Sequence, residues 1–489
     1  MRANNSTNSF WLTSGKSKTI NKGKLMREIM KCSHLYMMIM GMLVVCCLCS
    51  CSKDDDDTTG NGSDLNVVID SNGNANGGHS FTRIDDKNFY IDDIKYTVVD
   101  NALEVTGYDE TFFKGEAKII SSLNYHETLL DVKSIGKNAF SSCEALTTLS
   151  IPQSVTSIKE SAFRNCKQLK SISIKGEGLN TIDDSAFSGC VSITSFTIPS
   201  SVVSVGSWSF GGCSSLVSVI IGKNVTSISK DSFRGCTNLS SIKVESGNNK
   251  FDSRDNCNAL ITIGNNTLFL GFKNTTIPNS VTTIDDYAFY GCTGLKSLSI
   301  PTNVTSIGKS AFEGCSGLIT LDIPNSIASI NNSVFEGCTS LTSFIIPSSI
   351  TSIGYNSFAN CTNLETVTIG ENVEEISSGA FQGCNNLKTI TINSNYIIAK
   401  DYRYNYDSYY LYNLPKIFGD QVSHYIIGDN VTAIGEWAFS GSAGLTKIDI
   451  SNNVKSIGQN AFNCCTGLTS ITIPNSITSL GWSTFRNCI

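Results

Sequence analysis

The residues SIPTNVTSIGKSAFEGCSGLIT at positions 299–320 and SIPQSVTSIKESAFRNCKQLKS at positions 150–171 share the pattern S-I-P-x-x-V-T-S-I-x-x-S-A-F-x-x-C-x-x-L. The pattern recurs along most of the 489-residue chain. Its copies are marked by Phe140, Phe163, Phe187, Phe210, Phe233, Phe289, Phe312, Phe335, Phe358, Phe381, Phe439, Phe462 and Phe485. Ten of the twelve intervals between these residues are 23 or 24 residues, and the other two are 56 and 58. Such a fixed period indicates a repeat architecture with two inserts.

Apolar residues keep fixed places around each marker phenylalanine. An aliphatic residue lies five positions before it, from Ile135 to Leu480, and a strand pattern L-x-x-I-x-I follows, as at Leu468, Ile471 and Ile473. One coil of 23 residues cannot bury its own apolar face, so neighbouring coils must stack. We predict an α/β-type repeat solenoid, a horseshoe or rod with a parallel β-sheet on its concave face. Short 3-10 or irregular segments are expected on its convex face.

The repeat unit I-P-x-S-V-T-S-I-G-x-x-A-F-x-G-C-x-x-L-x-S resembles the BspA-like leucine-rich repeat, over roughly residues 131–489. The resemblance implies a leucine-rich repeat solenoid on a cell surface. Some members of the family are adhesins for host matrix proteins or other cells. An adhesive function is therefore what the resemblance implies, whereas the spacing of the residues predicts only the fold.

Most of the 19 cysteines follow the repeat, because one lies three residues after nearly every marker phenylalanine. This ladder consists of Cys143, Cys166, Cys190, Cys213, Cys236, Cys292, Cys315, Cys338, Cys361, Cys384, Cys465 and Cys488. Side chains in a ladder point the same way, which does not suit the geometry of a disulfide. Buried free cysteine packs as a small hydrophobic residue. We predict free thiols in the core; the alternatives are a few disulfides between adjacent coils, or metal binding, which the lack of a CxxC pair in the array disfavours.

Two positions of each strand are expected to face outward on the concave surface. The first is occupied by Thr148, Ser171, Ser195, Ser218, Ser241, Ser297, Thr320, Ser343, Thr366, Thr389, Lys447 and Ser470, and the second includes Ser150, Ser173, Thr197, Lys243, Asp322, Thr368, Asp449 and Thr472. Hydroxyl groups both donate and accept hydrogen bonds, so this face could bind glycans or peptide backbone. The alternative is that short polar residues simply suit a solvated sheet.

The two inserts break the uniformity of the array. In the first, near residues 245–274, two alternating runs flank Gly264, Asn265 and Asn266, which predicts a β-hairpin packed against the solenoid. The second, near residues 393–424, carries Tyr402, Arg403, Tyr404, Tyr406, Tyr409, Tyr410 and Tyr412. Tyrosine and arginine are enriched in binding hot spots, which makes these residues binding candidates. The alternative is a loop whose rings pack against neighbouring coils.

The N-terminal part predicts export and anchoring. Residues 1–50 contain a polar extension and an uncharged run, LYMMIMGMLVVCCLCS, that is typical of a signal peptide rather than a spanning helix. The end of this run resembles a lipoprotein lipobox, which implies Cys51 as the lipid anchor. The following Ser52, Lys53, Asp54, Asp55, Asp56 and Asp57 resemble the export signal of surface lipoproteins of the Bacteroidota. An uncleaved membrane anchor is the alternative.

The remaining segments complete the predicted domain organisation. Residues 51–80 are rich in Gly, Asn, Ser and Asp, which favours a flexible linker. Residues 81–130 contain strand patterns and are expected to form a small β cap over the first coil. Residues 131–489 form the repeat array of about 13 coils. No comparable cap is evident after Cys488, so we expect a fragment, a frayed coil or a coil covered by a partner.

Composition and motifs argue against catalysis and against nucleic acid. The net charge is only −6, and no basic patch is evident. The four histidines are isolated, and no HExxH, GxSxG or Walker motif occurs. We therefore predict no enzyme, cofactor or metal. The hypothesis is a lipid-anchored outer-membrane surface protein that binds host matrix protein, mucin or other cells; the alternatives are glycan capture for nutrient uptake and a passive coat component.

Overall fold

The computed structural model describes residues 66–70, 73–125, 127–402 and 413–488. Residues Asp64–Ile489 form one compact unit, and the other unit, Met1–Ser63, lies outside the described residues. The predicted signal peptide, the anchor Cys51 and the acidic run Ser52–Asp57 therefore stay predictions. Within the described ranges, no helix combines the length and the apolar character needed to span a bilayer.

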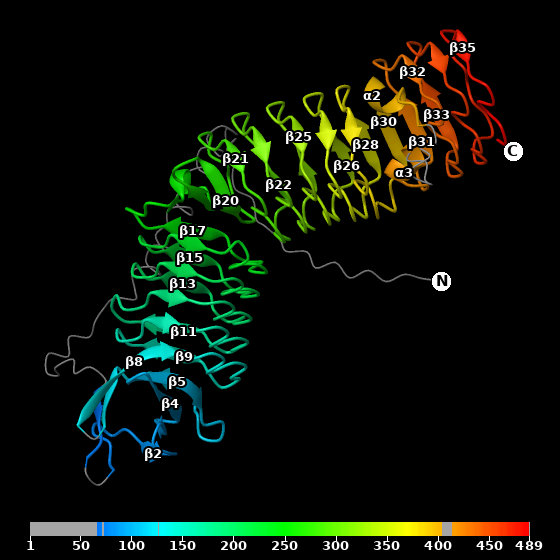
Figure 1. Cartoon of the computed structure of the whole chain (residues 1–489). Coiled ribbons are helices and arrows are strands. Elements are labelled where there is room, and N and C mark those ends of the chain that lie inside the picture. Colours follow the sequence, from blue (N-terminus) through cyan, green and yellow to red (C-terminus); the bar gives the residue numbers. More distant parts are fainter. Residues whose placement is uncertain (1–65, 71–72, 126, 403–412, 489) are drawn as a thin grey trace, which may run out of the picture. The chain divides into compact units, whose positions relative to one another are not determined.

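The unit is a parallel-strand solenoid in which most coils contribute two short strands (Figure 1). The strands of the pattern L-x-x-I-x-I form what we call the first ladder. It comprises β6 (Glu116–Lys118), β9 (Thr148–Ile151), β11 (Ser171–Ile174), β13 (Ser195–Ile198), β15 (Ser218–Ile221), β17 (Ser241–Val244), β22 (Ser297–Leu298), β24 (Thr320–Leu321), β26 (Ser343–Ile345), β28 (Thr366–Ile369), β30 (Thr389–Ile392), β31 (His424–Ile427) and β33 (Lys447–Ile450). This is the sheet that the sequence predicts.

A second ladder, which the sequence analysis did not foresee, runs through the V-T-S-I part of the repeat. Its strands are β8 (Thr128–Ile135), β10 (Ser157–Ile158), β12 (Thr181–Ile182), β14 (Ser204–Val205), β16 (Ser227–Ile228), β21 (Thr283–Ile284), β23 (Ser306–Ile307), β25 (Ser329–Ile330), β27 (Ser352–Ile353), β29 (Glu375–Ile376), β32 (Ala433–Ile434), β34 (Ser456–Ile457) and β35 (Ser479–Leu480). Successive strands pair in parallel and in register, serine against serine and isoleucine against isoleucine, as in β10 and β8.

The A-F-x-G-C part of each coil forms turns, not the predicted 3-10 helix. These turn segments bond directly to the next coil: the Phe140 amide donates to the Ala162 carbonyl at 2.7 Å, and the Ser142 amide donates to the Arg164 carbonyl at 2.6 Å. Such bonding needs a left-handed residue two positions after the phenylalanine, as at Gly189 with φ of 74°. Glycine adopts this conformation without steric cost, which explains its frequency there.

Stacked aromatic rings fill the core beside the turn segments. From Phe140 to Phe233, from Phe289 to Phe381 and from Phe439 to Phe485, consecutive marker rings stack with centroids 5.1–5.6 Å apart. Aromatic pairs at this separation contribute beyond the area that they bury. The columns are interrupted where the two inserts enter, so the inserts change the core as well as the surface.

An antiparallel meander covers the first coil, as predicted. It contains β2 (Phe81–Arg83), β3 (Asn88–Ile91), β4 (Ile94–Val99) and β5 (Ala102–Tyr108), and β5 pairs in parallel with β8 of the second ladder. A hairpin partner, β7 (Ser122–Tyr125), pairs with β8 and with β1 (Asn66–Val68). Because β1 lies inside residues 51–80, the folded part begins earlier than the predicted linker allows.

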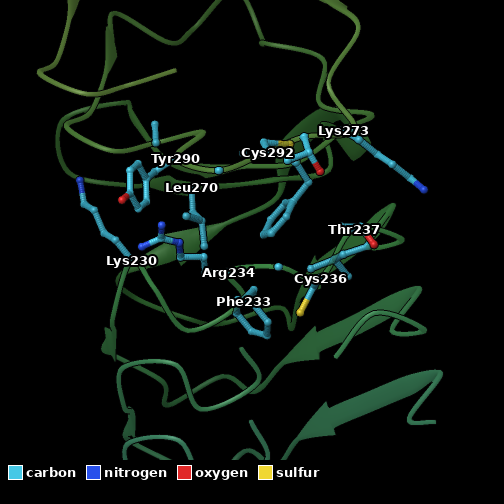
Figure 2. Close-up of a pocket in the computed structure, with 17 residues that line it drawn as sticks. Lys230, Phe233, Arg234, Cys236, Thr237, Leu270, Lys273, Tyr290 and Cys292 are labelled. Atoms are coloured by element: carbon cyan, nitrogen blue, oxygen red, sulfur yellow. The ribbon is translucent and has the colours of Figure 1, made fainter. Parts of the chain in front are cut away.

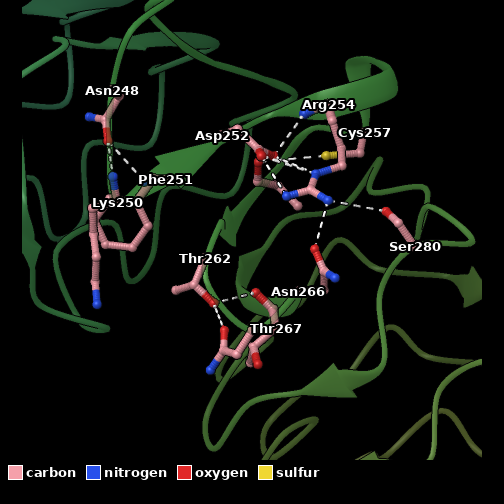
Figure 3. A network of polar contacts seen from close by, with 12 residues as sticks. Asn248, Lys250, Phe251, Asp252, Arg254, Cys257, Thr262, Asn266, Thr267 and Ser280 are labelled. Atoms are coloured by element: carbon pink, nitrogen blue, oxygen red, sulfur yellow. Dashed lines mark hydrogen bonds and ion pairs between the residues drawn. The ribbon is translucent and has the colours of Figure 1, made fainter.

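The first insert forms the predicted hairpin and joins the second ladder. It contains β18 (Phe251–Asp252), the 3-10 helix η1 (Arg254–Asn256), β19 (Ala259–Thr262) and β20 (Thr267–Gly271), and β20 pairs in parallel with β21. The hairpin therefore replaces a coil strand rather than decorating a flank. Figure 3 shows the polar network that fixes it: the Arg254 guanidinium binds the Asp252 carboxylate and donates to Asn266 Oδ1 at 2.8 Å.

The second insert lengthens one coil without breaking the first ladder. Strands β30 and β31 pair in register across it, with Thr389 opposite His424. Two short helices, α2 (Asn395–Ile398) and α3 (Leu414–Phe418), replace the second-ladder strand and the turn segment of this coil. The Leu414 amide donates to the Ala438 carbonyl, as a marker phenylalanine would. The Phe418 ring packs against Phe381, with centroids 5.1 Å apart.

Candidate binding surfaces

The outward positions of the first ladder form the hydroxyl face, defined by the two sets of residues given above. Most of them are exposed, and neighbours lie in register, as Ser343 does with Thr366. A shallow hollow of about 330 Å³ lies over β22 and β24 and is lined by Ser297, Thr320 and Asp322 among others. Serine and threonine are also frequent along the second ladder, however. Hydroxyl content alone therefore does not single out the first ladder as a binding surface.

Two features give the hydroxyl face local character. Ile345 exposes 72% of its surface in the middle of β26, where the other coils carry mostly polar residues. Near the C-terminal end, His424 Nε2 and Lys447 Nζ each lie 2.7 Å from Asp449 Oδ2. The hydrogen bonds from Lys447 and His424 hold the pKa of Asp449 below its ordinary value. The face thus offers an apolar contact and a charged cluster in addition to its hydroxyl groups.

The tyrosine-rich part of the second insert is only partly described. Tyr402 is 7% exposed, and its hydroxyl donates to the Ile397 carbonyl at 2.6 Å. Tyr402 is therefore a core residue, which corrects its prediction as a binding residue. The other candidates, Arg403, Tyr404, Tyr406, Tyr409, Tyr410 and Tyr412, lie outside the described residues. Next to Tyr402, a hollow of about 320 Å³ is lined by Tyr355 and Glu374, among other residues.

A cavity at the first insert was not predicted from the sequence. It measures about 40 Å³ and lies between the coil of Phe233 and the coil of Cys292, with Lys273 also in its lining (Figure 2). On one side of it, the Arg234 guanidinium stacks over two rings, 5.0 Å from the centroid of Trp208 and 4.1 Å from that of Tyr290. No sequence signal could have found it, since these residues belong to coils separated by the insert.

The cysteine ladder is confirmed as a column of free thiols. All cysteines within the described ranges are free, and most are buried. Each regular thiol donates to the marker carbonyl of the preceding coil, as Cys338 does to Phe312 at 3.2 Å. Burial raises the pKa of Cys338 to about 12 and that of Cys292 to about 11. Thiols in this state are poor nucleophiles and poor metal ligands, so the ladder is structural.

Among the described residues, no group of three or more histidine, cysteine, aspartate or glutamate side chains is placed to hold a metal ion. His79 Nδ1 pairs with Asp92, and His424 pairs with Asp449. Both pairs are far from any other nucleophile or base that the structure describes. The geometry therefore points to surfaces for binding rather than to a catalytic centre.

Stacked coils of this length, with a leucine or isoleucine column and a parallel sheet, define the class of leucine-rich repeat solenoids. The model of the BspA type leucine rich repeat region matches residues 133–260, 262–388, 329–421 and 415–489, in six copies. The chain belongs to this family. No curated protein matches the chain.

Solved structures support the fold. A leucine-rich repeat protein from Bacteroides ovatus is 28% identical, with a TM-score of 0.52, over 82% of this chain and 92% of that one. The pneumococcal vaccine antigen PcpA is 20% identical, with a TM-score of 0.54, over 76% of this chain and 98% of that one. A leucine rich cell surface protein from Faecalibacterium prausnitzii is 27% identical, with a TM-score of 0.42, over 63% of this chain and 96% of that one.

Proposed function

We propose that this protein is a cell-surface binding protein that holds an extended ligand on its hydroxyl face. The observation that carries the proposal is the exposed, in-register row of outward residues along β26, β28 and β30. A rigid sheet presents these groups without first having to be ordered, which lowers the entropic cost of binding. The family supports this use, because leucine-rich repeat solenoids are binding scaffolds.

The proposed ligand is a host matrix protein, a mucin or another cell, which makes the protein an adhesin. The proposed anchor is a lipid on Cys51, followed by the acidic run Ser52–Asp57 as the signal for exposure on the outer membrane. A tether of this kind would hold the solenoid away from the lipid surface, since like charges repel and extend a linker. Glycan capture for nutrient uptake and a passive coat role are the competing proposals.

An array of matrix proteins, mucins and glycans tests the proposal. The chain from Thr58 onward should bind at least one of these in a saturable manner. The double variant Ser343→Arg and Thr366→Arg places two bulky charges at paired positions of the hydroxyl face and should weaken binding at least tenfold. Ser306→Arg, at an exposed position of the second ladder, is the matched control and should bind like the unmodified chain.

The competing proposals make different predictions on the same array. Free sugars should compete with the ligand if the protein captures glycans, and should have no effect if it recognises protein. Replacing Tyr404, Tyr406, Tyr409, Tyr410 and Tyr412 with alanine tests the second insert. Tyr402 is kept, because its burial would confuse a loss of fold with a loss of binding. Absence of any saturable ligand, with the chain shown to be folded, would favour the coat role.

A further inference from the structure

The turn segments are joined from coil to coil by a regular set of backbone hydrogen bonds that stops at the first insert. The Phe210 amide donates to the Ser232 carbonyl at 2.8 Å, and the Gly212 amide donates to the Arg234 carbonyl at 2.7 Å. One coil later, the amides of Phe233 and Gly235 have no acceptor within the part of the chain that the structure describes. Both point toward the following coil, because every equivalent amide does.

The hairpin of the first insert explains this interruption. The acceptor that Phe233 would use, the carbonyl of Ala288, instead takes a hydrogen bond from the Gly271 amide at 2.8 Å. Gly291 of the next coil lies over the side chain of Arg234, so the two turn segments are also displaced along the chain. Phe233 is only 5% exposed, and an unpaired amide in such a place is costly. The gap therefore favours any group that can accept these hydrogen bonds.

The cavity in this gap is too large to be a packing defect and too small for a sugar ring. It measures about 40 Å³, and Phe233, Gly235 and Lys273 contribute to its lining. One water-sized group needs about 10–15 Å³, so about three such groups fit. A carboxylate, with one carbon and two oxygens, has this size.

Positive charge at the cavity is not neutralised by the protein. The Arg234 guanidinium stacks on Trp208 and Tyr290 and forms no ion pair among the described residues, so the N–H groups along its edge lack an acceptor. Lys273 likewise forms no ion pair there, whereas Lys230 is paired with Asp285 at 2.7 Å. A planar guanidinium fixed between two rings is preorganised for a planar oxyanion. Figure 2 shows Arg234 beside the ring of Tyr290.

We propose that the gap at the first insert is a binding site for a small carboxylate, held by the Arg234 guanidinium and the amides of Phe233 and Gly235. Water would satisfy the two amides but would leave the arginine uncompensated, whereas a carboxylate satisfies both. The site is independent of the hydroxyl face, so it does not depend on the proposed function. It gives the first insert a role that its packing alone does not supply.

Titration of the full chain with acetate, followed by saturation-transfer NMR at constant ionic strength in chloride, tests the site. We expect saturable binding with a dissociation constant on the order of millimolar, as suits a single charge-assisted contact. Arg234→Gln should weaken this binding at least tenfold. Arg164→Gln is the matched control, because Arg164 occupies the same place in a coil whose amides are bonded, and it should bind acetate like the unmodified chain.

Alkylation of Cys292, which lines the cavity and is partly exposed, locates the bound anion. A carboxylate beside this thiol raises its pKa, so acetate should slow its reaction with iodoacetamide, while Cys464 should be unaffected. Should Arg234→Gln fail to fold by circular dichroism, Lys273→Gln provides the second variant, with a loss on the order of threefold. No saturable acetate signal, or equal affinity in the folded Arg234 variant, would overturn the site and leave the gap to water.

Discussion

Replacement of Phe335 by alanine tests the physical basis of the fold. Phe335 is fully buried, and its ring stacks on Phe312 at 5.6 Å and on Phe358 at 5.2 Å. A third ring, Phe344, packs at 5.0 Å. The side chain thus joins three consecutive coils, and its removal leaves a cavity that the rigid stack cannot close.

The expected loss follows from the buried area. A phenylalanine side chain buries about 150–250 Å², and at about 25 cal/mol per Å² this contributes about 4–6 kcal/mol. Alanine retains the Cβ atom, so the expected destabilisation is about 3–5 kcal/mol. Phe485 is half-buried in the last marker position and stacks only on Phe462, so its replacement should cost about 1–2 kcal/mol.

Hydrogen exchange read by mass spectrometry is the suitable assay, because a long repeat array need not unfold as one unit. In the Phe335 variant, protection should fall most in the coils that contact the ring and progressively less in coils further away. Phe335→Leu, which keeps most of the volume, should lose less than half as much. Equal losses at Phe335 and Phe485, or a loss below about 1 kcal/mol at Phe335, would refute the stacking argument.

Three further changes have definite expected results. Tyr425→Phe should raise the free energy of unfolding by about 1–2 kcal/mol, because the buried hydroxyl of Tyr425 has no hydrogen-bond partner; a lower melting temperature would contradict this. Gly271→Ala should destabilise the chain by more than about 2 kcal/mol, since a Cβ there would lie 2.1 Å from an aromatic ring, whereas Gly264→Ala should be nearly neutral in the same thermal scan. Cys338 should resist iodoacetamide at pH 8, where its pKa of about 12 leaves almost no thiolate, while the partly exposed Cys464 reacts; equal rates by peptide mass spectrometry would be inconsistent with the buried ladder.

The sequence was sufficient for the parts of the fold that depend on period and polarity. The 23-residue repeat predicted the first ladder, and the uniform spacing of Cys143 and its equivalents predicted free thiols in the core. The alternating runs around Gly264 predicted the hairpin. Each of these features is local or strictly periodic, so burial in one coil implies burial in the next.

Other features could not be predicted because they arise between coils. Strands of two residues, such as Ser157–Ile158, are too short to show an alternating pattern, and they become strands only when the neighbouring coil supplies their hydrogen bonds. The bonding of Phe140 to Ala162 has the same origin. Tyr402 was grouped with its tyrosine-rich neighbours, although its hydroxyl satisfies a carbonyl inside the core. The Arg234 site depends on bonds that are missing, which no residue pattern records.

The most direct test of the central claim is a hydrogen-exchange footprint of the protein with a ligand identified on the array. If the hydroxyl face is the binding surface, the peptides that contain β26, β28 and β30 should gain protection when the ligand is added, and the second-ladder peptides that contain β23 should not. Protection confined to the second ladder or to the inserts, or no change at saturating ligand, would contradict the claim.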